Sequence, residues 1–176
     1  IIYAVGSKSL WLAQDEGLAH FNLQTKHVDI IKYPVGEPNY KEFRELRALS
    51  MDKNGLLWIG TYKNGVYLYD TVNRKFSHLD DSFGLSHPEI LKIFKDNQQN
   101  MWVGTGNGVN IWNEPMQRFF SFESADVKAG GLLGSIIQDI HQSKDGNIWI
   151  ATQKGLNLYL PESTSFKKFN TEDGLS

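Results

Sequence analysis

One tryptophan-centred motif occurs four times along this chain, and no other feature constrains the fold as strongly. Successive tryptophans are separated by 47, 44 and 47 residues, at Trp11, Trp58, Trp102 and Trp149. A glycine follows each Trp after six residues, or after seven in the second copy, where one extra residue is inserted. Apolar residues at 17 and 20 positions after Trp keep the same shift. These matched offsets indicate an internal repeat, which must be identified before the fold is considered further.

Each copy of the repeat carries the signals of four short strands. Apolar residues alternate along 109–112 and 156–159, and this period of two is typical of a strand. Asn54-Gly55 and Asp145-Gly146, just ahead of two Trp strands, favour tight hairpin turns. Four antiparallel strands in each 44 to 47 residues match the period of a propeller blade. We therefore predict an all-β β-propeller of four four-stranded antiparallel blades; a β-sandwich of irregular hairpins would not explain the shared offsets.

The repeat also predicts where each blade lies and how neighbouring blades pack. We expect blade 1 at about residues 1–33, blade 2 at about 46–79, blade 3 at about 90–122, blade 4 at about 136–169, and a link to a next blade at 170–176. In every copy the residue two after Trp is Gly or Ala, and both residues point to the same sheet face. A large ring beside a small residue allows neighbouring sheets to interlock at the density of a protein interior. We expect structural roles for the four tryptophans, with Trp58, Trp102 and Trp149 buried.

Composition and motifs argue against several classes of chemistry. The chain has 18 Lys and Arg against 20 Asp and Glu, too balanced to attract nucleic acid or an anionic membrane by charge. It has no Cys, no apolar run near the ~20 residues of a membrane helix, and no metal-binding spacing among its five His. The glycine-rich run 104–108 is followed by an alternating strand rather than the helix that a nucleotide-binding loop needs. We expect no cofactor, no metal site and no catalysis.

The motif around the fourth Trp is specific enough to resemble a known family. The run 144–159 reads Lys-Asp-Gly-Asn-Ile-Trp-Ile-Ala-Thr-Gln-Lys-Gly-Leu-Asn-Leu-Tyr, and Trp-Ile-Gly-Thr at 58–61 and Trp-Val-Gly-Thr at 102–105 match it. Gly-Leu-Ser occurs at 84–86 and again at 174–176. This pattern resembles the two-component regulator propeller repeat of bacterial sensor proteins. The resemblance covers the whole chain and is weakest in the first copy, where Ala13-Gln14 replaces Gly-Thr.

The resemblance implies a role and a location. Such repeats usually build seven-bladed propellers in the periplasmic part of sensor histidine kinases or diguanylate cyclases, and the best-known members respond to polysaccharide breakdown products. Four repeats then imply a fragment of a seven-bladed propeller in a ligand-sensing, signal-transducing segment. Two alternatives remain at this point: a propeller scaffold for protein docking, and a propeller lyase or hydrolase.

Loops on one face of the predicted propeller are the expected recognition surface. The links between blades vary in length and emerge on the same face as the hairpins that join the second and third strands, and variable loops on a rigid scaffold commonly carry binding. An aromatic ring beside hydrogen-bonding side chains suits a sugar, so we expect an oligosaccharide ligand. The candidate ligand-binding residues are Tyr40, Arg44, Tyr62 and His87.

Four blades also raise the question of what covers the outer blades. A four-bladed chain must either close tightly or expose two broad apolar sheet faces, far more than the few hundred Å² that a soluble monomer tolerates. We therefore expect as partners either a second copy of the chain, giving an eight-bladed ring, or further blades of the parent protein.

Overall fold

The described residues form sixteen strands arranged in four antiparallel sheets, and the helical elements among them are short 3-10 turns. The computed structural model describes residues 1–5, 7–14, 17–34, 43–124 and 131–175. Within each sheet the strands follow the order of the chain, so every strand pairs with its sequence neighbour. The prediction of an all-β fold of four four-stranded antiparallel blades is confirmed.

Every blade is a four-stranded meander. Blade 1 comprises β1 (Ile2–Val5), β2 (Ser9–Gln14), β3 (Gly17–Asn22) and β4 (Val28–Ile31). Blade 2 comprises β5 (Leu46–Met51), β6 (Leu56–Thr61), β7 (Val66–Asp70) and β8 (Lys75–Leu79). Blade 3 comprises β9 (Ile90–Lys95), β10 (Met101–Thr105), β11 (Gly108–Asn113) and β12 (Arg118–Phe122). Blade 4 comprises β13 (Ile137–Gln142), β14 (Ile148–Thr152), β15 (Gly155–Leu160) and β16 (Ser165–Phe169).

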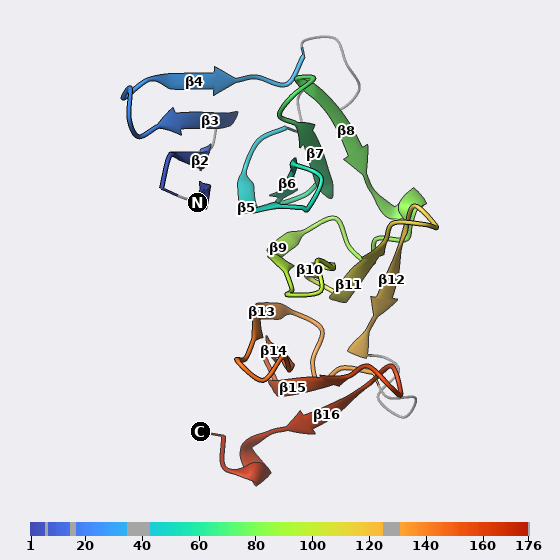
Figure 1. Cartoon of the computed structure of the whole chain (residues 1–176). Coiled ribbons are helices and arrows are strands. Elements are labelled where there is room, and N and C mark those ends of the chain that lie inside the picture. Colours follow the sequence, from blue (N-terminus) through green and yellow to red (C-terminus); the bar gives the residue numbers. More distant parts are fainter. Residues whose placement is uncertain (6, 15–16, 35–42, 125–130, 176) are drawn as a thin grey trace.

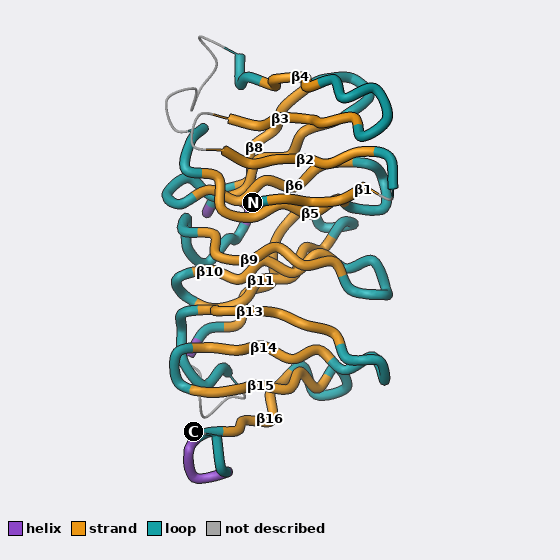
Figure 2. The backbone as a smooth tube through the Cα atoms, turned by 90° about the vertical axis from the view of Figure 1, so that its left-hand side faces the viewer, coloured by secondary structure: helices purple, strands orange, loops and turns teal. Residues whose placement is uncertain are grey.

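The four blades follow one another along an open arc. Figure 1 shows the blades fanning out from their first strands, with blade 1 and blade 4 at opposite ends of the arc. The innermost strands β1, β5, β9 and β13 succeed one another at the inner edge, where β5 contacts β9 and β9 contacts β13. Figure 2 shows the sheets from the side, stacked face to face. Blade 1 therefore does not close onto blade 4, and one face of each remains without a neighbouring blade.

The hydrophobic core lies between blades rather than inside any one of them. Three clusters of buried side chains are present, one for each pair of consecutive blades. Trp58 of blade 2 packs edge-on against Trp112 of blade 3, with ring centroids 5.8 Å apart. Beside Trp58, a Cβ added to Gly60 would come within 2.4 Å of Ile90 Cγ2. Ile90 therefore fills the space that a side chain at position 60 would occupy. The predicted interlocking of ring and hole is thus a contact between consecutive blades.

A buried aspartate shapes the hairpin ahead of two of the tryptophans. Asp52 Oδ1 accepts hydrogen bonds from the backbone N–H groups of Asn54 and Leu56, and its Oδ2 accepts one from Trp58 Nε1 at 3.2 Å. In blade 3, Asp96 Oδ2 accepts the corresponding bond from Trp102 Nε1 at 2.9 Å. Because a carboxylate offers several acceptor sites, one side chain closes the turn and also satisfies a buried indole N–H.

The expected burial of Trp149 is wrong. Trp58 and Trp102 are 1% and 2% exposed, whereas Trp149 is only half-buried. Trp149 lies on the face of blade 4 that no described segment covers, and its ring contacts Phe169 of its own blade, with centroids 5.7 Å apart. Ser143 also takes the place of the aspartate in this hairpin. A repeated position therefore becomes buried only where a following blade lies against it.

Candidate functional site

Inter-blade links and the second hairpin of each blade meet at one edge of the blades, here called the loop face. The hairpin N–H of Tyr62 donates to the carbonyl of Glu45, and that of Gly106 donates to Glu89, both at 3.1 Å. These bonds fix each hairpin to the link that precedes its blade. The arrangement expected from the strand order is therefore present, and the candidate residues can be placed on it.

The four candidate residues do not form one cluster in the described part of the chain. Tyr40 lies outside the described residues. Arg44 and Tyr62 lie at the loop end of blade 2, where Arg44 is exposed and Tyr62 half-buried. His87 lies on blade 3, where its Nδ1 accepts a 3.2 Å hydrogen bond from the backbone N–H of Glu89. A Cβ at Gly106 would lie 2.9 Å from His87 Nδ1, so the imidazole covers that hairpin.

Tyr62 is flanked by two cationic side chains. The guanidinium carbon of Arg47 lies 4.4 Å from the centre of the Tyr62 ring, and Lys63 Nζ lies 5.1 Å from it. Both distances are within the range of about 6 Å in which a cation is attracted to an aromatic face. The loop end of blade 2 therefore presents an aromatic ring with two positive charges beside it.

Arg47 occupies a bulge that recurs in the innermost strand of three blades. The pairing with the second strand shifts at this point in β5, β9 and β13, and the residues skipped are Arg47, Leu91 and Gln138. A bulge turns the extra residue away from the regular ladder and re-aims its side chain. Because the other blades accommodate Leu or Gln here, the fold does not require arginine at this position.

Tyr62 is likewise a departure from the repeat. The hairpin after β6 runs through Tyr62, Lys63 and Asn64, one residue longer than the corresponding hairpins of blades 3 and 4. Tyr62 of the longer hairpin and Arg47 of the bulge thus contact each other, although they are separated in the sequence. Arg47 is not among the ligand-binding residues predicted from the sequence. Comparison of the first residues of the innermost strands would identify it as the residue that departs from the repeat.

A contact between two blades, also not expected from the sequence, lies on the innermost strands. Lys92 Nζ of β9 and Asp139 Oδ1 of β13 form an ion pair at 2.6 Å. Each follows its bulged residue by one position. The pair neutralises the cation of blade 3, whereas no carboxylate in the described residues forms an ion pair with Arg47 of blade 2.

Three pockets lined by described residues lie at the opposite edge of the blades, beside the first and third hairpins. One groove lies between each pair of consecutive blades, with volumes of about 310, 230 and 280 Å³ from blade 1 to blade 4. Each is bordered by the Trp of one blade and the aromatic residue of the next, as with Trp102 and Tyr159. Since the groove recurs at every junction, it follows from the divergence of the blades and does not single out one site.

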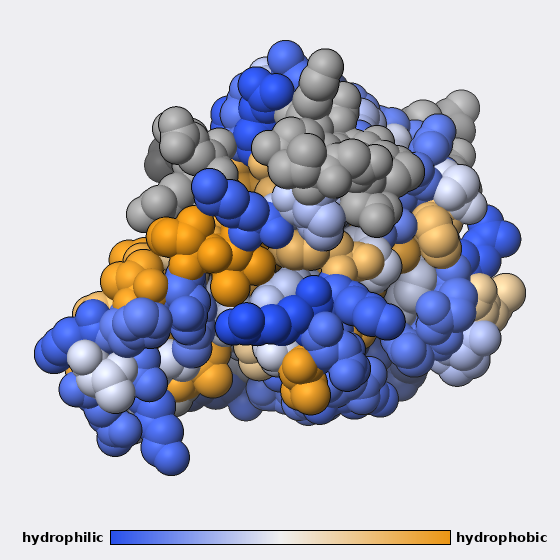
Figure 3. Space-filling model, turned by 90° about the horizontal axis from the view of Figure 1, so that it is seen from above, coloured by the Kyte–Doolittle hydropathy of each residue, from blue (hydrophilic) through white to orange (hydrophobic). Residues whose placement is uncertain are grey.

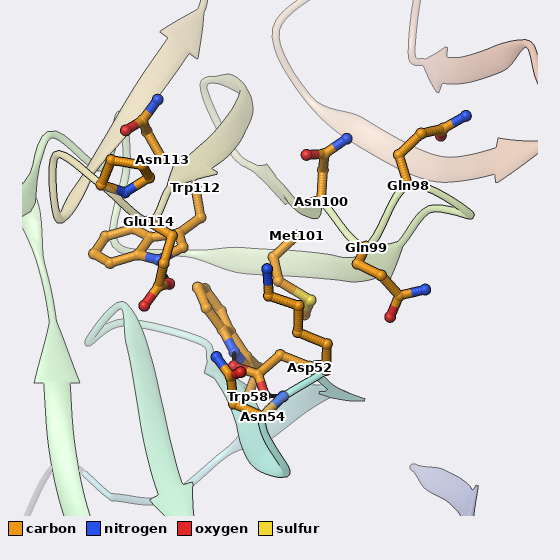
Figure 4. A pocket seen from close by; sticks show the side chains of 12 residues that line it. Asp52, Asn54, Trp58, Gln98, Gln99, Asn100, Met101, Trp112, Asn113 and Glu114 are labelled. Atoms are coloured by element: carbon orange, nitrogen blue, oxygen red, sulfur yellow. Dashed lines mark hydrogen bonds between the residues drawn. The ribbon is translucent and has the colours of Figure 1, made fainter.

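The groove between blades 2 and 3 is the most polar of the three. Figure 4 shows its two indoles beside each other at a steep angle, with amide side chains around the opening. The indole N–H of Trp58 donates to Asp52, and that of Trp112 donates to Glu114 Oε2 at 2.7 Å. Both indoles are almost fully buried, so a ligand in this groove would meet ring edges and amides rather than an open aromatic face.

Hydrogen bonds and burial shift the pKa values of a few described groups. In the link after β8, hydrogen bonds from the hydroxyl and backbone N–H of Ser82 hold the pKa of Asp80 below its ordinary value. Burial raises the pKa of Tyr69 and Tyr159, which contact the tryptophans of the preceding blades. No group of three or more His, Asp or Glu side chains in the described part of the chain could hold a metal ion.

Comparison with known proteins identifies the repeat. The description "two component regulator propeller" matches residues 44–63, 84–107 and 131–154, which include the Trp strand or its preceding link in blades 2 to 4. A curated relative, histidine kinase P4 of Formosa agariphila, is 28% identical over 138 residues. That alignment covers 71% of this chain and 10% of the relative, so the chain spans only a small part of the longer protein.

Solved structures share the fold over nearly the whole chain. The extracellular domain of the hybrid two component system BT3049 from B. thetaiotaomicron superposes with a TM-score of 0.83 at 22% identity, covering 99% of this chain and 23% of that one. Virginiamycin B lyase from Staphylococcus aureus reaches a TM-score of 0.71 at 16% identity, covering 96% of this chain and 54% of the lyase. At these identities the likeness concerns the fold alone.

Among the described residues no helix is long and apolar enough to cross a membrane. The repeat is recognised in blades 2, 3 and 4, and the same architecture recurs in the extracellular domains of sensor systems. Blades 2, 3 and 4 thus each carry a repeat that matches the two component regulator propeller.

Proposed function

We propose that this chain is a non-catalytic, ligand-sensing segment in the periplasmic part of a membrane-bound bacterial sensor. The repeat family and the extracellular sensor domains of the same fold support this role. A ligand could change the output only if it binds two arrangements of the sensor with different affinity. Rigid blades joined by buried interfaces suit this task, because a contact at a loop is then transmitted to neighbouring blades as a whole.

The loop end of blade 2 is the proposed ligand site. The observation that carries this proposal is the contact of Arg47 with Tyr62, in which two departures from the repeat meet. Residues that deviate from a repeated scaffold are free of its packing requirements, and loops on such scaffolds commonly carry recognition. Arg44 lies in the link at the same blade end and is part of the proposed site, as is Tyr40 on grounds of sequence alone.

An oligosaccharide is the proposed ligand class. A sugar ring has an apolar face that can rest on the Tyr62 ring, and hydroxyl groups that accept bonds from arginine and lysine. His87 is proposed as an outer contact on blade 3, at the next link along the loop face. The groove between blades 2 and 3 on the opposite edge is less suited, because its two indoles are almost fully buried.

Ligand-induced thermal shift tests the proposed site. The chain and its Tyr62→Ala variant are melted with and without a panel of oligosaccharides, together with Gln153→Ala, which changes the corresponding hairpin of blade 4. We expect a sugar that stabilises the wild type and the Gln153 variant but not the Tyr62 variant. A sugar that shifts all three proteins equally would place recognition elsewhere.

Protein docking is the second candidate function. The outward face of blade 4 is half-exposed around Trp149, which favours a macromolecular partner at the end of the arc. A lyase or hydrolase has only the likeness to virginiamycin B lyase in its favour, and that likeness concerns the fold. We therefore propose no catalytic activity for this segment.

A further inference from the structure

Two positive charges lie beside the Tyr62 ring, and no acid of the described residues forms an ion pair with either of them. Arg47 and Lys63 both lie within 5.1 Å of the ring centre, so the charges are separated by no more than about one Debye length at moderate ionic strength, roughly 10 Å. The ion pairs of the described residues are His27–Asp29, His78–Asp80 and Lys92–Asp139. Neither Arg47 nor Lys63 takes part in any of them.

The repeat provides an internal comparison for this charge. In blade 3, Lys92 directly follows the bulged residue, and its Nζ forms an ion pair with Asp139 Oδ1 at 2.6 Å. The bulge positions equivalent to Arg47 hold Leu91 and Gln138, neither of which is cationic. The blade therefore does not require an arginine at this position, and in the described part of the chain neither Arg47 nor Lys63 is neutralised by an ion pair.

The Arg47 guanidinium lies over the Tyr62 ring, with its central carbon 4.4 Å from the ring centre. A guanidinium that stacks on an aromatic face keeps its N–H groups, which lie in its plane, directed outwards. Those groups match two oxygens of a carboxylate or a sulfate in a bidentate arrangement. The Tyr62 ring thus orients Arg47 as a receptor for a planar or tetrahedral anion, with Lys63 as a second point charge.

We propose that the ligand of the blade-2 loop end carries a negative charge, a carboxylate or a sulfate on a sugar, which Arg47 binds beside Tyr62 and Lys63. This proposal rests on the sensing function proposed above and makes it more specific. Arg47 selects the acidic group, and Tyr62 supports both the guanidinium and the sugar ring.

Isothermal titration with three probes tests the charge of the ligand. Trigalacturonate supplies carboxylates, a sulfated galactose disaccharide supplies sulfate, and cellotriose is the neutral comparison. Each probe is titrated into the chain, into Arg47→Gln and Arg47→Lys, and into Lys154→Gln, which removes a cation from the corresponding hairpin of blade 4. Thermal melts of the variants serve as a check on folding; Arg47 is exposed at a bulge, so we expect no change.

We expect an acidic probe to bind, and its affinity to fall as sodium chloride is added. Arg47→Gln should lower the affinity for the acidic probe by roughly ten-fold or more, as expected for the loss of a charge-assisted hydrogen-bond pair. The affinity of Arg47→Lys should lie between those of the wild type and of Arg47→Gln. Lys154→Gln should bind like the wild type. The stronger of the two acidic probes then identifies the anion.

Three results would overturn the proposal. If cellotriose binds and Arg47→Gln leaves its affinity unchanged, the ligand is not anionic, although the site still binds a sugar. If an acidic probe binds and neither salt nor Arg47→Gln lowers its affinity, Arg47 does not take part in the site. No binding of any probe, combined with no thermal shift by the wider sugar panel, would contradict the sensing function as well.

Discussion

At the scale of single residues, each tryptophan has the role that its surroundings allow. Trp102 donates to Asp96, lies 5.1 Å from the Tyr159 ring and is 2% exposed. Trp149 has Ser143 in place of the aspartate and no covering blade among the described residues. The same residue in the same repeat position therefore differs in its contribution to stability.

Replacing these two tryptophans measures that difference. Trp102→Ala should lower the free energy of unfolding by about 3–5 kcal/mol, because it opens a cavity in a closed interface and leaves a buried carboxylate without its donor. Trp149→Ala should cost clearly less, since this side chain is only partly buried. Urea denaturation of both variants checks the order, and equal losses would show that the face of blade 4 is covered in solution.

At the scale of elements, the junction between blades depends on a complementary pair. A Cβ on Gly104 would approach Ile137 Cγ2 to 2.5 Å, too close for any real contact. The equivalent positions of blades 1 and 2 hold Ala13 and Leu46, which lie in one buried cluster. Leucine has no branch at Cβ, so an alanine opposite it can be accommodated. The chain thus contains two versions of the same junction, Gly with Ile and Ala with Leu.

A double-mutant cycle tests this pairing. Gly104→Ala alone should destabilise the chain by about 1–3 kcal/mol through overpacking against Ile137. Ile137→Leu alone should cost less than about 1.5 kcal/mol as a volume-conserving change. The double variant recreates the Ala–Leu pair and should be more stable than the sum of the single losses implies. Strict additivity in urea denaturation would show that the two side chains do not constrain each other.

The link that precedes blade 2 is held by other contacts than the links that precede blades 3 and 4. In blades 3 and 4 a buried asparagine binds the incoming link: Asn110 Oδ1 accepts from the N–H of Ser86, and Asn157 Oδ1 from that of Leu133. Blade 2 has Tyr67 at this position, packed edge-on against Phe43 of the first link. The described end of the link that precedes blade 2 is thus held by aromatic packing.

At the scale of the whole molecule, the open arc leaves apolar side chains uncovered at its ends. On blade 1, Ile2, Val28 and Ile30 are 67%, 47% and 59% exposed. Figure 3, which views the molecule from the blade-1 end, shows hydrophobic side chains gathered over part of this surface. On blade 4 the uncovered face includes Trp149 and Leu160. Apolar sheet faces of this kind mark interaction surfaces in soluble proteins.

We therefore expect the isolated chain to self-associate through blades 1 and 4, unless further blades cover them. Leu158, on the uncovered face of blade 4, is the position for a test: Leu158→Lys introduces a charge there and should shift the chain towards monomer. Lys168→Ala, on the opposite face of the same blade, is the comparison. Sedimentation analysis checks the outcome. A monodisperse wild-type monomer that binds no hydrophobic dye would contradict the expectation.

Sequence alone determined the repeat, the four strands of each blade and the pairing of a large ring with a small residue. These follow from local chemistry: the alternation of apolar residues, the Asn-Gly and Asp-Gly turns, and Trp followed two residues later by Gly or Ala. The position of Tyr62 as an inserted residue was also visible, because the repeat supplies its own reference. The site residues Arg44 and His87 were selected by residue type and loop position alone.

Only the tertiary structure decided which repeated positions are buried and which departures from the repeat meet. The burial of Trp102 and the exposure of Trp149 depend on whether another sheet lies against them, a property that no local pattern contains. The contact of Arg47 with Tyr62 depends on a bulge in β5 and on the approach of a hairpin from the neighbouring strand. Side chains far apart in sequence come together through sheet register and blade stacking, and both are set by the packing of the whole chain.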